Sequence, residues 1–305
     1  MIWFWTGPFL YLAAAVFVAG ATWKVVGLAR LPRHLRWELY PIPHLGPEGS
    51  KYQKVDFAAL PRRSARLREI VFTAQEILLL KKVFAARRDL WLGSWLLHAG
   101  LYLGIVFLGL LGAGAIPALL ESSASAVPRL LPRATGAMGV CSLVSGLAGT
   151  VYLLCLRLAD RGLRDMSDRI TFFNLILLAA LFGSGLLAWG TGPAFVQAQS
   201  HLVSLLRGRP AAVESSALAS ALVLTGLFVA YLPFSRMFHA AAKYFFYHAI
   251  LWDEEPMRRG GRMEQDIAAC LDGRVTWSAA HVRQNESWRG QIGGAEDTKG
   301  ATHGP

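Results

Sequence analysis

Histidine is the residue type in this 305-residue chain best suited to hold a metal or a redox group. Eight are present, and only His98 lies well inside a long apolar run. It follows Asp89 by nine residues, about 13 Å along a helix from that charge. His239 lies three residues after Arg236, where another apolar run ends. Ionisable residues at membrane depth are costly and usually functional, so His98 is the first candidate for chemistry.

Two imidazoles on facing helices can hold a haem iron between them, and Arg236, one turn before His239, can neutralise a haem propionate. A histidine at membrane depth can equally form only a hydrogen bond to a neighbouring helix. His248 lies beyond the membrane and fits a surface or partner contact, whereas His201, in an outer loop, fits a structural role. The three cysteines, without a C-x-x-C spacing, are too few to hold an iron–sulfur cluster within this chain alone.

The elements that must position these histidines are membrane-spanning helices. The chain is 54% hydrophobic but only 17% charged, against about a quarter charged in soluble domains. Its apolar residues gather in long charge-free runs, and a helix needs roughly 20 such residues to cross a bilayer. Gly192 and Pro193 indicate that the fourth helix ends near Gly190 and that a loop follows. The expected fold is an all-α membrane bundle of five helices, at approximately residues 5–28, 91–115, 134–157, 170–191 and 215–250.

Lysine and arginine counts predict the orientation of the bundle. Residues 30–88, 157–169 and 236–305 carry thirteen, four and nine of them, whereas residues 113–133 and 193–214 carry two each. We therefore expect the N-terminus outside, and the loop 29–90 and the tail 253–305 in the cytoplasm. The first 23 residues hold no charge, which favours a retained anchor over a cleaved signal peptide. We expect residues 1–252 to form the membrane domain of a protein of a bacterial or archaeal cytoplasmic membrane.

The segments outside the membrane carry their own signals. Residues 37–44 are aromatic and proline-rich, which favours extended backbone. Residues 69–88 read as one helix along the inner membrane surface or against a partner. The fifth helix is expected to continue towards residue 252, and the last fifteen residues to be disordered. The net charge of +11 suits anionic lipid or a docking partner, and nucleic acid is not expected because the charge follows the membrane margins.

Several segments resemble the gamma, or cytochrome b, subunit of respiratory nitrate reductase. The likeness is closer to related subunits of sulfate-reducer transmembrane complexes and of membrane-bound heterodisulfide reductase-like complexes. It runs from the first helix to about residue 288, and no single stretch decides it. The segments that carry it are residues 37–41 (WELYP), 95–103 (WLLHAGLYL), 231–239 (YLPFSRMFH), 243–253 (KYFFYHAILWD) and 275–281 (VTWSAAH).

The resemblance implies that His98 and His239 hold the inner of two b haems that the family stacks across the bilayer. The outer haem of that family needs two more histidines, at positions that here are Leu108 and Ala221. Neither side chain can ligate iron, and Met138 is an unusual ligand for a b-type haem. One b haem is therefore expected. A second stays open if His201, the other histidine on the outer side, binds one.

The function implied is electron transfer between membrane quinone, such as menaquinone, and a cytoplasmic iron–sulfur subunit of a heterodisulfide reductase-like complex. Further membrane or periplasmic cytochrome subunits are compatible with it. Candidate regions for the quinone or the partner are the stretch around Lys243, Tyr244 and His248, and residues 37–44. The main alternative is a haem-free membrane anchor for a cytoplasmic enzyme. A transporter would show more polar clusters at the midplane, and a hydrogenase or formate dehydrogenase cytochrome would turn its large surfaces outward.

Overall fold

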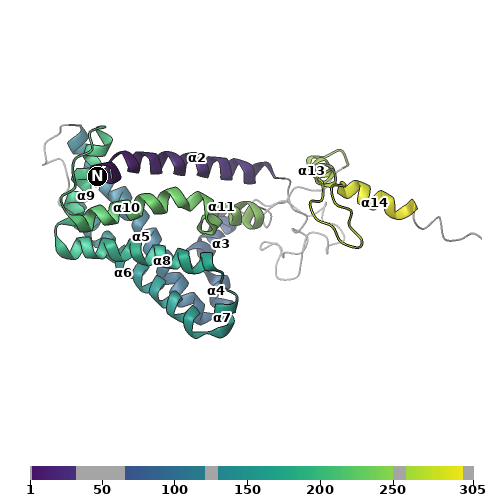
Figure 1. Cartoon of the computed structure of the whole chain (residues 1–305), viewed down its shortest axis with the longest axis horizontal. Helices are drawn as coiled ribbons and strands as arrows, with labels where there is room; N and C mark the ends of the chain where they lie inside the picture. The colour runs from purple at the N-terminus through teal and green to yellow at the C-terminus, as the bar shows by residue number, and fades with distance from the viewer. Residues whose placement is uncertain (1, 32–65, 121–129, 250–258, 298–305) are drawn as a thin grey trace, which may run out of the picture. The chain divides into compact units, whose positions relative to one another are not determined.

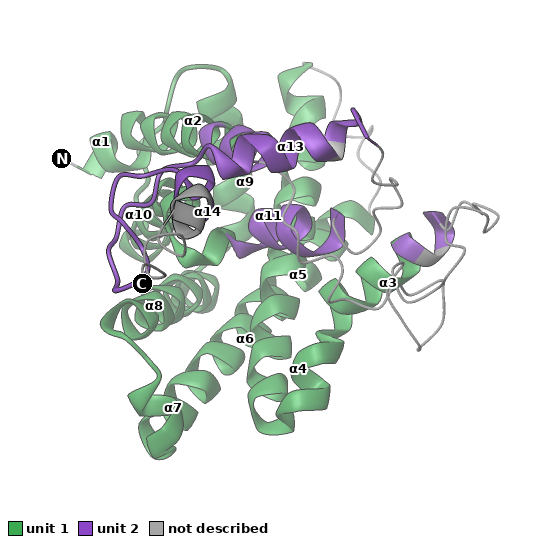
Figure 2. Ribbon diagram, turned by 90° about the vertical axis from the view of Figure 1, so that its right-hand side faces the viewer, with its two compact units in different colours: residues 1–22, 70–238 green, residues 23–69, 239–305 purple. Residues whose placement is uncertain are grey.

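The computed structural model describes residues 2–31, 66–120, 130–249 and 259–297. These ranges are mostly helical and contain no strand, only two isolated β-bridges, Arg274 with Ser287 and Ala279 with Val282. The chain divides into two compact units, the first of residues 1–22 and 70–238 and the second of residues 23–69 and 239–305 (Figure 2).

Five helical stretches in the described ranges are long and apolar enough to cross a membrane, which confirms the all-α class and the five apolar helices expected from the sequence. The first stretch consists of α1 (Ile2–Thr6) and α2 (Pro8–Arg30). The others are α5 (Arg88–Leu119), α6 (Leu130–Ala159), α8 (Arg169–Thr191) and the stretch Ser216–Phe234, which contains α10 (Ser216–Tyr231) (Figure 1). The orientation in a membrane stays a prediction.

Small residues bring α5 and α6 into close contact within the first unit. A Cβ added at Gly100 would lie 2.5 Å from the Cα of Gly146, and one at Gly149 would meet the backbone of Leu97. The Ser142 hydroxyl donates a 2.7 Å hydrogen bond to the Gly100 carbonyl. Close approach through small residues is how helices associate where lipid removes the hydrophobic driving force. The contact fixes which face of α5 is turned towards α6.

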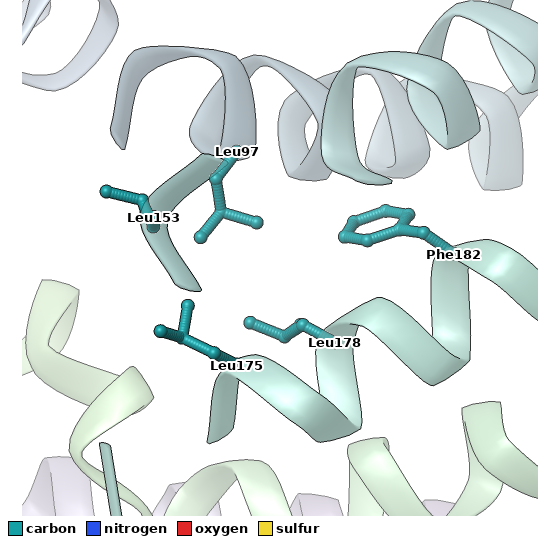
Figure 3. Packing of buried hydrophobic residues seen from close by; sticks show 5 residues of the cluster. All are labelled: Leu97, Leu153, Leu175, Leu178 and Phe182. Carbon is teal, nitrogen blue, oxygen red and sulfur yellow. The ribbon is translucent and has the colours of Figure 1, made fainter. Parts of the chain in front are cut away.

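The apolar core of the first unit joins α5, α6 and α8. Phe182 packs over Gly146, where a side chain on α6 would collide with its ring. The three helices contribute one buried cluster, Leu97, Leu153, Leu175, Leu178 and Phe182 (Figure 3). Nearby, the Tyr231 hydroxyl donates a 3.0 Å hydrogen bond to the side-chain oxygen of Asn174, which ties α10 to α8.

The region after the fourth helix is helical rather than the loop expected from the sequence. Helix α8 ends at Thr191, and α9 (Ala194–Leu206) begins after Pro193. Proline suits the start of a helix because its missing N–H needs no partner there. Helix α9 lies at the same end of the first unit as the N-terminus, opposite α4 (Lys81–Ala86) and α7 (Arg161–Asp165) (Figure 1).

Two other helices differ from their predicted extent. The single helix expected over residues 69–88 is broken into α3 (Arg66–Leu79) and α4, because Leu80 has a left-handed backbone with φ of 49°. The fifth helix was expected to run on to residue 250, but α10 ends at Tyr231. Two 3-10 turns follow it, Leu232–Phe234 and Arg236–Phe238. Pro233 lacks an N–H for the helical ladder, which explains the second break.

The described part of the second unit includes residues on both sides of a gap at 250–258. Besides the end of α2 and the first residues of α3, it contains α11 (His239–Lys243) and a π-helical turn, Tyr244–His248. Beyond the gap come α13 (Arg262–Leu271) and α14 (Trp288–Asp297), with the two β-bridges between them. Residues 291–297 of α14 fall in the stretch for which the sequence predicts disorder. Val275 and Val282, in the segment that connects α13 to α14, are both buried.

Candidate functional site

His98 lies in the first half of α5, ten residues after the helix begins at Arg88. Its Nδ1 lies 2.7 Å from the carbonyl oxygen of Ser94, and the ring is partly buried. A carbonyl only accepts, so the proton of the neutral ring lies on Nδ1 and the coordinating lone pair on Nε2. A hydrogen bond on one ring nitrogen that fixes the tautomer is the usual support of a metal-binding histidine.

His98 lies within an aromatic stripe on one face of α5. Trp91, Trp95 and Tyr102 lie on the same helix face as His98, at the spacings i−7, i−3 and i+4. The rings of Trp91 and Trp95 are stacked with centroids 5.9 Å apart, and the Tyr102 ring centroid lies 6.1 Å from that of His98. This stripe is distinct from the face of Gly93, Leu97 and Gly100, which is buried against α6.

The stripe binds the C-terminal end of α3. Trp91 and Trp95 donate from Nε1 to the carbonyl oxygens of Leu79 and Leu78, at 2.8 and 3.1 Å. The Tyr102 hydroxyl donates to the Ile77 carbonyl at 3.0 Å. The last carbonyls of a helix have no partner within the helix, so these three donors satisfy groups that would otherwise need water. They also hold α3 beside the face of α5 that carries His98.

Arg236 is held by the start of α8. Its guanidinium lies 2.7 Å from the carboxylate of Asp168, which caps α8 by accepting hydrogen bonds from the Thr171 amide and hydroxyl at 2.9 and 2.7 Å. These two hydrogen bonds, followed by the charge of Arg236, hold the pKa of the Asp168 carboxyl below its usual range. Arg236 remains 69% exposed, so the ion pair leaves much of its guanidinium accessible. Its predicted contact with a propionate stays a prediction.

His239 is the first residue of α11, and its side chain is exposed. The structure describes it within the second unit, whereas His98 belongs to the first, so the pairing of the two imidazoles stays a prediction. Further along the second unit, Lys243 Nζ lies 5.9 Å from the centroid of the Tyr247 ring, and Tyr244 is 54% exposed. His248 is only 3% exposed and packs edge-on against Tyr247, so it is not the surface residue that its position suggested.

His201 is a buried part of the packing at the N-terminal end of the first unit. Its Nε2 lies 2.6 Å from the Thr6 carbonyl oxygen, and only 4% of the residue is exposed. The Nε2 proton is therefore donated to the backbone, and Nδ1, which keeps the lone pair, has no hydrogen-bond partner among the described residues. The Tyr11 hydroxyl reinforces this contact by donating to the Leu205 carbonyl at 2.5 Å. These bonds suit the structural role first considered for His201.

Two features near the start of α5 were not predicted from the sequence. Arg87 forms ion pairs with Asp89 and, at 3.1 Å, with Asp160, which joins the start of α5 to the end of α6 and raises the pKa of Arg87 above its usual range. Glu76, on α3, is only 4% exposed. No sequence signal indicated its burial, since the apolar residues Ile77 and Leu78 next to it favour the opposite arrangement, in which Glu76 is exposed. The residues 37–44 lie outside the described ranges.

Comparison of the chain with models of known protein families, with curated proteins and with solved structures finds no match.

Proposed function

We propose that this chain is the haem b subunit of a membrane-bound oxidoreductase, which passes electrons between membrane quinone and a cytoplasmic iron–sulfur subunit. The observation that carries the proposal is His98. It lies within an apolar span, and its Nδ1 is hydrogen-bonded to the Ser94 carbonyl, so that Nε2 presents the lone pair.

The donor set fits a b haem. The imidazoles of His98 and His239 would hold its iron, and Arg236 would offer a positive charge to a propionate. When bound, such a haem carries one electron at a time. Asp168 holds the side chain of Arg236 and caps α8, the Tyr102 ring packs near His98, and Trp91 and Trp95 lie on the same face of α5. The resemblance described above supplies the identity of the cofactor, and the structural contacts support it only at His98 and Arg236.

One haem is favoured over two. Leu108 and Ala221, which occupy the positions of the outer ligands, have no donor atoms. His201 already donates from Nε2 to the Thr6 carbonyl, and a second haem would need that bond to break or Nδ1 to bind iron from a buried position. With a single inner haem, a quinone site on the same side gives the shorter electron path. The cation and aromatic rings of Lys243, Tyr244 and Tyr247 are our candidate for it.

The test is the haem content of the detergent-solubilised full chain, measured by pyridine haemochrome and by reduced-minus-oxidised spectra. We expect about one b haem per chain, lost in His98→Ala and kept in His281→Ala, because His281 is exposed on the tail. Two haems, one of which is lost in His201→Ala, would restore an electron path across the whole membrane. Absence of haem from freshly prepared chain would refute the proposal and leave the haem-free anchor.

A further inference from the structure

Helix α3 has the polarity of its faces reversed relative to a helix on a water-soluble surface. Ile70, Val71 and Leu78 are 63%, 46% and 55% exposed, and they share one face of the helix. Glu76, on the opposite face, is 4% exposed. In water, folding turns apolar side chains inward and leaves carboxylates outside. The reverse arrangement is the one that a lipid environment favours, because ionisable groups there face the protein interior.

The contacts of α3 lie along the membrane-spanning part of α5. Trp95 and Tyr102, which bind the Leu78 and Ile77 carbonyls, follow Arg88 by seven and fourteen residues. These residues lie about 10 and 21 Å along the helix from Arg88. The charges that mark the aqueous boundary, Arg87 and Asp160, lie at the beginning of α5 and the end of α6. The end of α3 is therefore beside a part of α5 that lies within the bilayer if α5 spans it.

We propose that α3 is embedded in the bilayer, with Ile70, Val71 and Leu78 in contact with lipid acyl chains and with Glu76 turned to the protein. The inference rests on the membrane location in the proposed function. We assign the occupant as lipid rather than a soluble partner, because the apolar helix α5, which α3 contacts, also exposes large apolar side chains, with Ile105 and Val106 68% and 48% exposed. Trp91, Trp95 and Tyr102 then donate hydrogen bonds to the α3 carbonyls, which water could not reach within lipid.

The break at Leu80 separates the apolar helix α3 from the lysines that follow it. After the left-handed residue, Lys81 and Lys82 begin α4, and both are exposed. Long cationic side chains next to a buried apolar helix can extend to the headgroups while their stems remain in the apolar layer. A straight helix over residues 69–88 would carry these lysines and Arg87 along the same axis as Leu78. The break separates the embedded part from the charged part.

The test is spin-label accessibility in the full chain reconstituted in liposomes. The native Cys141, Cys155 and Cys270 are replaced by alanine, and single cysteines are introduced by Ile70→Cys or Leu78→Cys. Ile105→Cys provides a reference for lipid exposure, and Ser278→Cys, in the exposed tail, a reference for water exposure. Collision rates with oxygen, which concentrates in lipid, and with a nickel chelate, which stays in water, are measured at each position.

We expect the labels at Ile70 and Leu78 to match that at Ile105, with a high oxygen rate and a low nickel rate. A nickel rate matching that at Ser278 would place α3 at an aqueous surface and overturn the inference. Low rates with both reagents would mean that protein covers this face, which overturns it equally. If the label at Ile105 is itself accessible to nickel, the proposed membrane location fails, and this result separates the two proposals.

Discussion

At the scale of single residues, local hydrogen bonds decide what each candidate side chain can do. The Nδ1 of His98 is bound to the Ser94 carbonyl, whereas His201 is bound through Nε2 to the Thr6 carbonyl. The sequence distinguished the two by position, His98 lying within a long apolar run and His201 in a predicted loop after Gln199 and Ser200. In His98 the lone pair then lies on Nε2, as the proposed haem ligation requires, whereas His201 donates its Nε2 proton to the backbone. Local contacts also define the role of Asp168, whose carboxylate both caps α8 and binds Arg236.

The double role of Asp168 predicts a pH-dependent stability. Asp168→Asn keeps a good cap but loses the ion pair, whereas Asp168→Ala loses both, so thermal unfolding in detergent should give Tm values in the order wild type, Asn, Ala. Because the folded-state pKa of this carboxyl is lowered, its contribution is present above its unfolded pKa of about 3.9 and is lost as the pH falls through the lower folded value. The difference between wild type and Asp168→Asn should therefore shrink as the pH falls below about 4. A difference that stays constant from neutral pH to acid would contradict this account of Asp168.

At the scale of the helices, sequence reasoning succeeds where apolar runs are long and fails where single residues redirect the chain. Five apolar helices could be predicted because a helix that spans a bilayer needs roughly 20 consecutive apolar residues, and few other structures contain such long apolar runs. The short helix α9 was missed because Gly192 and Pro193 were interpreted as the start of a loop. The break at Leu80 could not be predicted, because nothing in a leucine indicates a left-handed backbone. The break near Pro233 could have been predicted from the proline, but the aromatic residues that follow suggested that the helix continues.

The close contact of α5 with α6 predicts the effect of a single methyl group. Gly100→Ala would place a Cβ against the backbone of Gly146 and should force the helices apart, at a cost of about 1–3 kcal/mol of stability. Gly109→Ala, on the same helix, is the matched control, because nothing lies within 4 Å of its added Cβ. Thermal unfolding of both variants in the same detergent measures the difference. Equal stability of the two variants would mean that α5 and α6 are less closely packed than described.

At the scale of the whole molecule, the distribution of charge is the argument for orientation. Most of the 31 lysine and arginine residues lie in residues 30–88, 157–169 and 236–305. The positive-inside rule assigns these three segments to the cytoplasm. The structure supplies five apolar helices, an odd number, which places the two ends of the chain on opposite sides if all of them span. An inner haem, an inner quinone site and a cytoplasmic partner all depend on this orientation.

The orientation predicts where a reporter fused to the chain is active. A green fluorescent protein fused after Pro305 should fluoresce in a bacterial host. This reporter folds in the cytoplasm but does not become fluorescent when the general secretion route exports it unfolded. An alkaline phosphatase fused in the same position should be inactive, because it needs the oxidising side to form its disulfides. Fusions of the two reporters after Arg209, in the predicted outer segment, should show the opposite pattern. The reverse result at both positions would invert the topology.

The most direct test of the central claim, that His98 and His239 hold a b haem, is near-infrared magnetic circular dichroism of the oxidised, purified full chain. The energy of the charge-transfer band of low-spin ferric haem depends on its two axial ligands. We expect the band of a bis-imidazole haem in wild type, and its loss or displacement in both His98→Ala and His239→Ala, but not in His281→Ala. A bis-imidazole band that survives in either ligand variant, or no haem at all in wild type, would contradict the account.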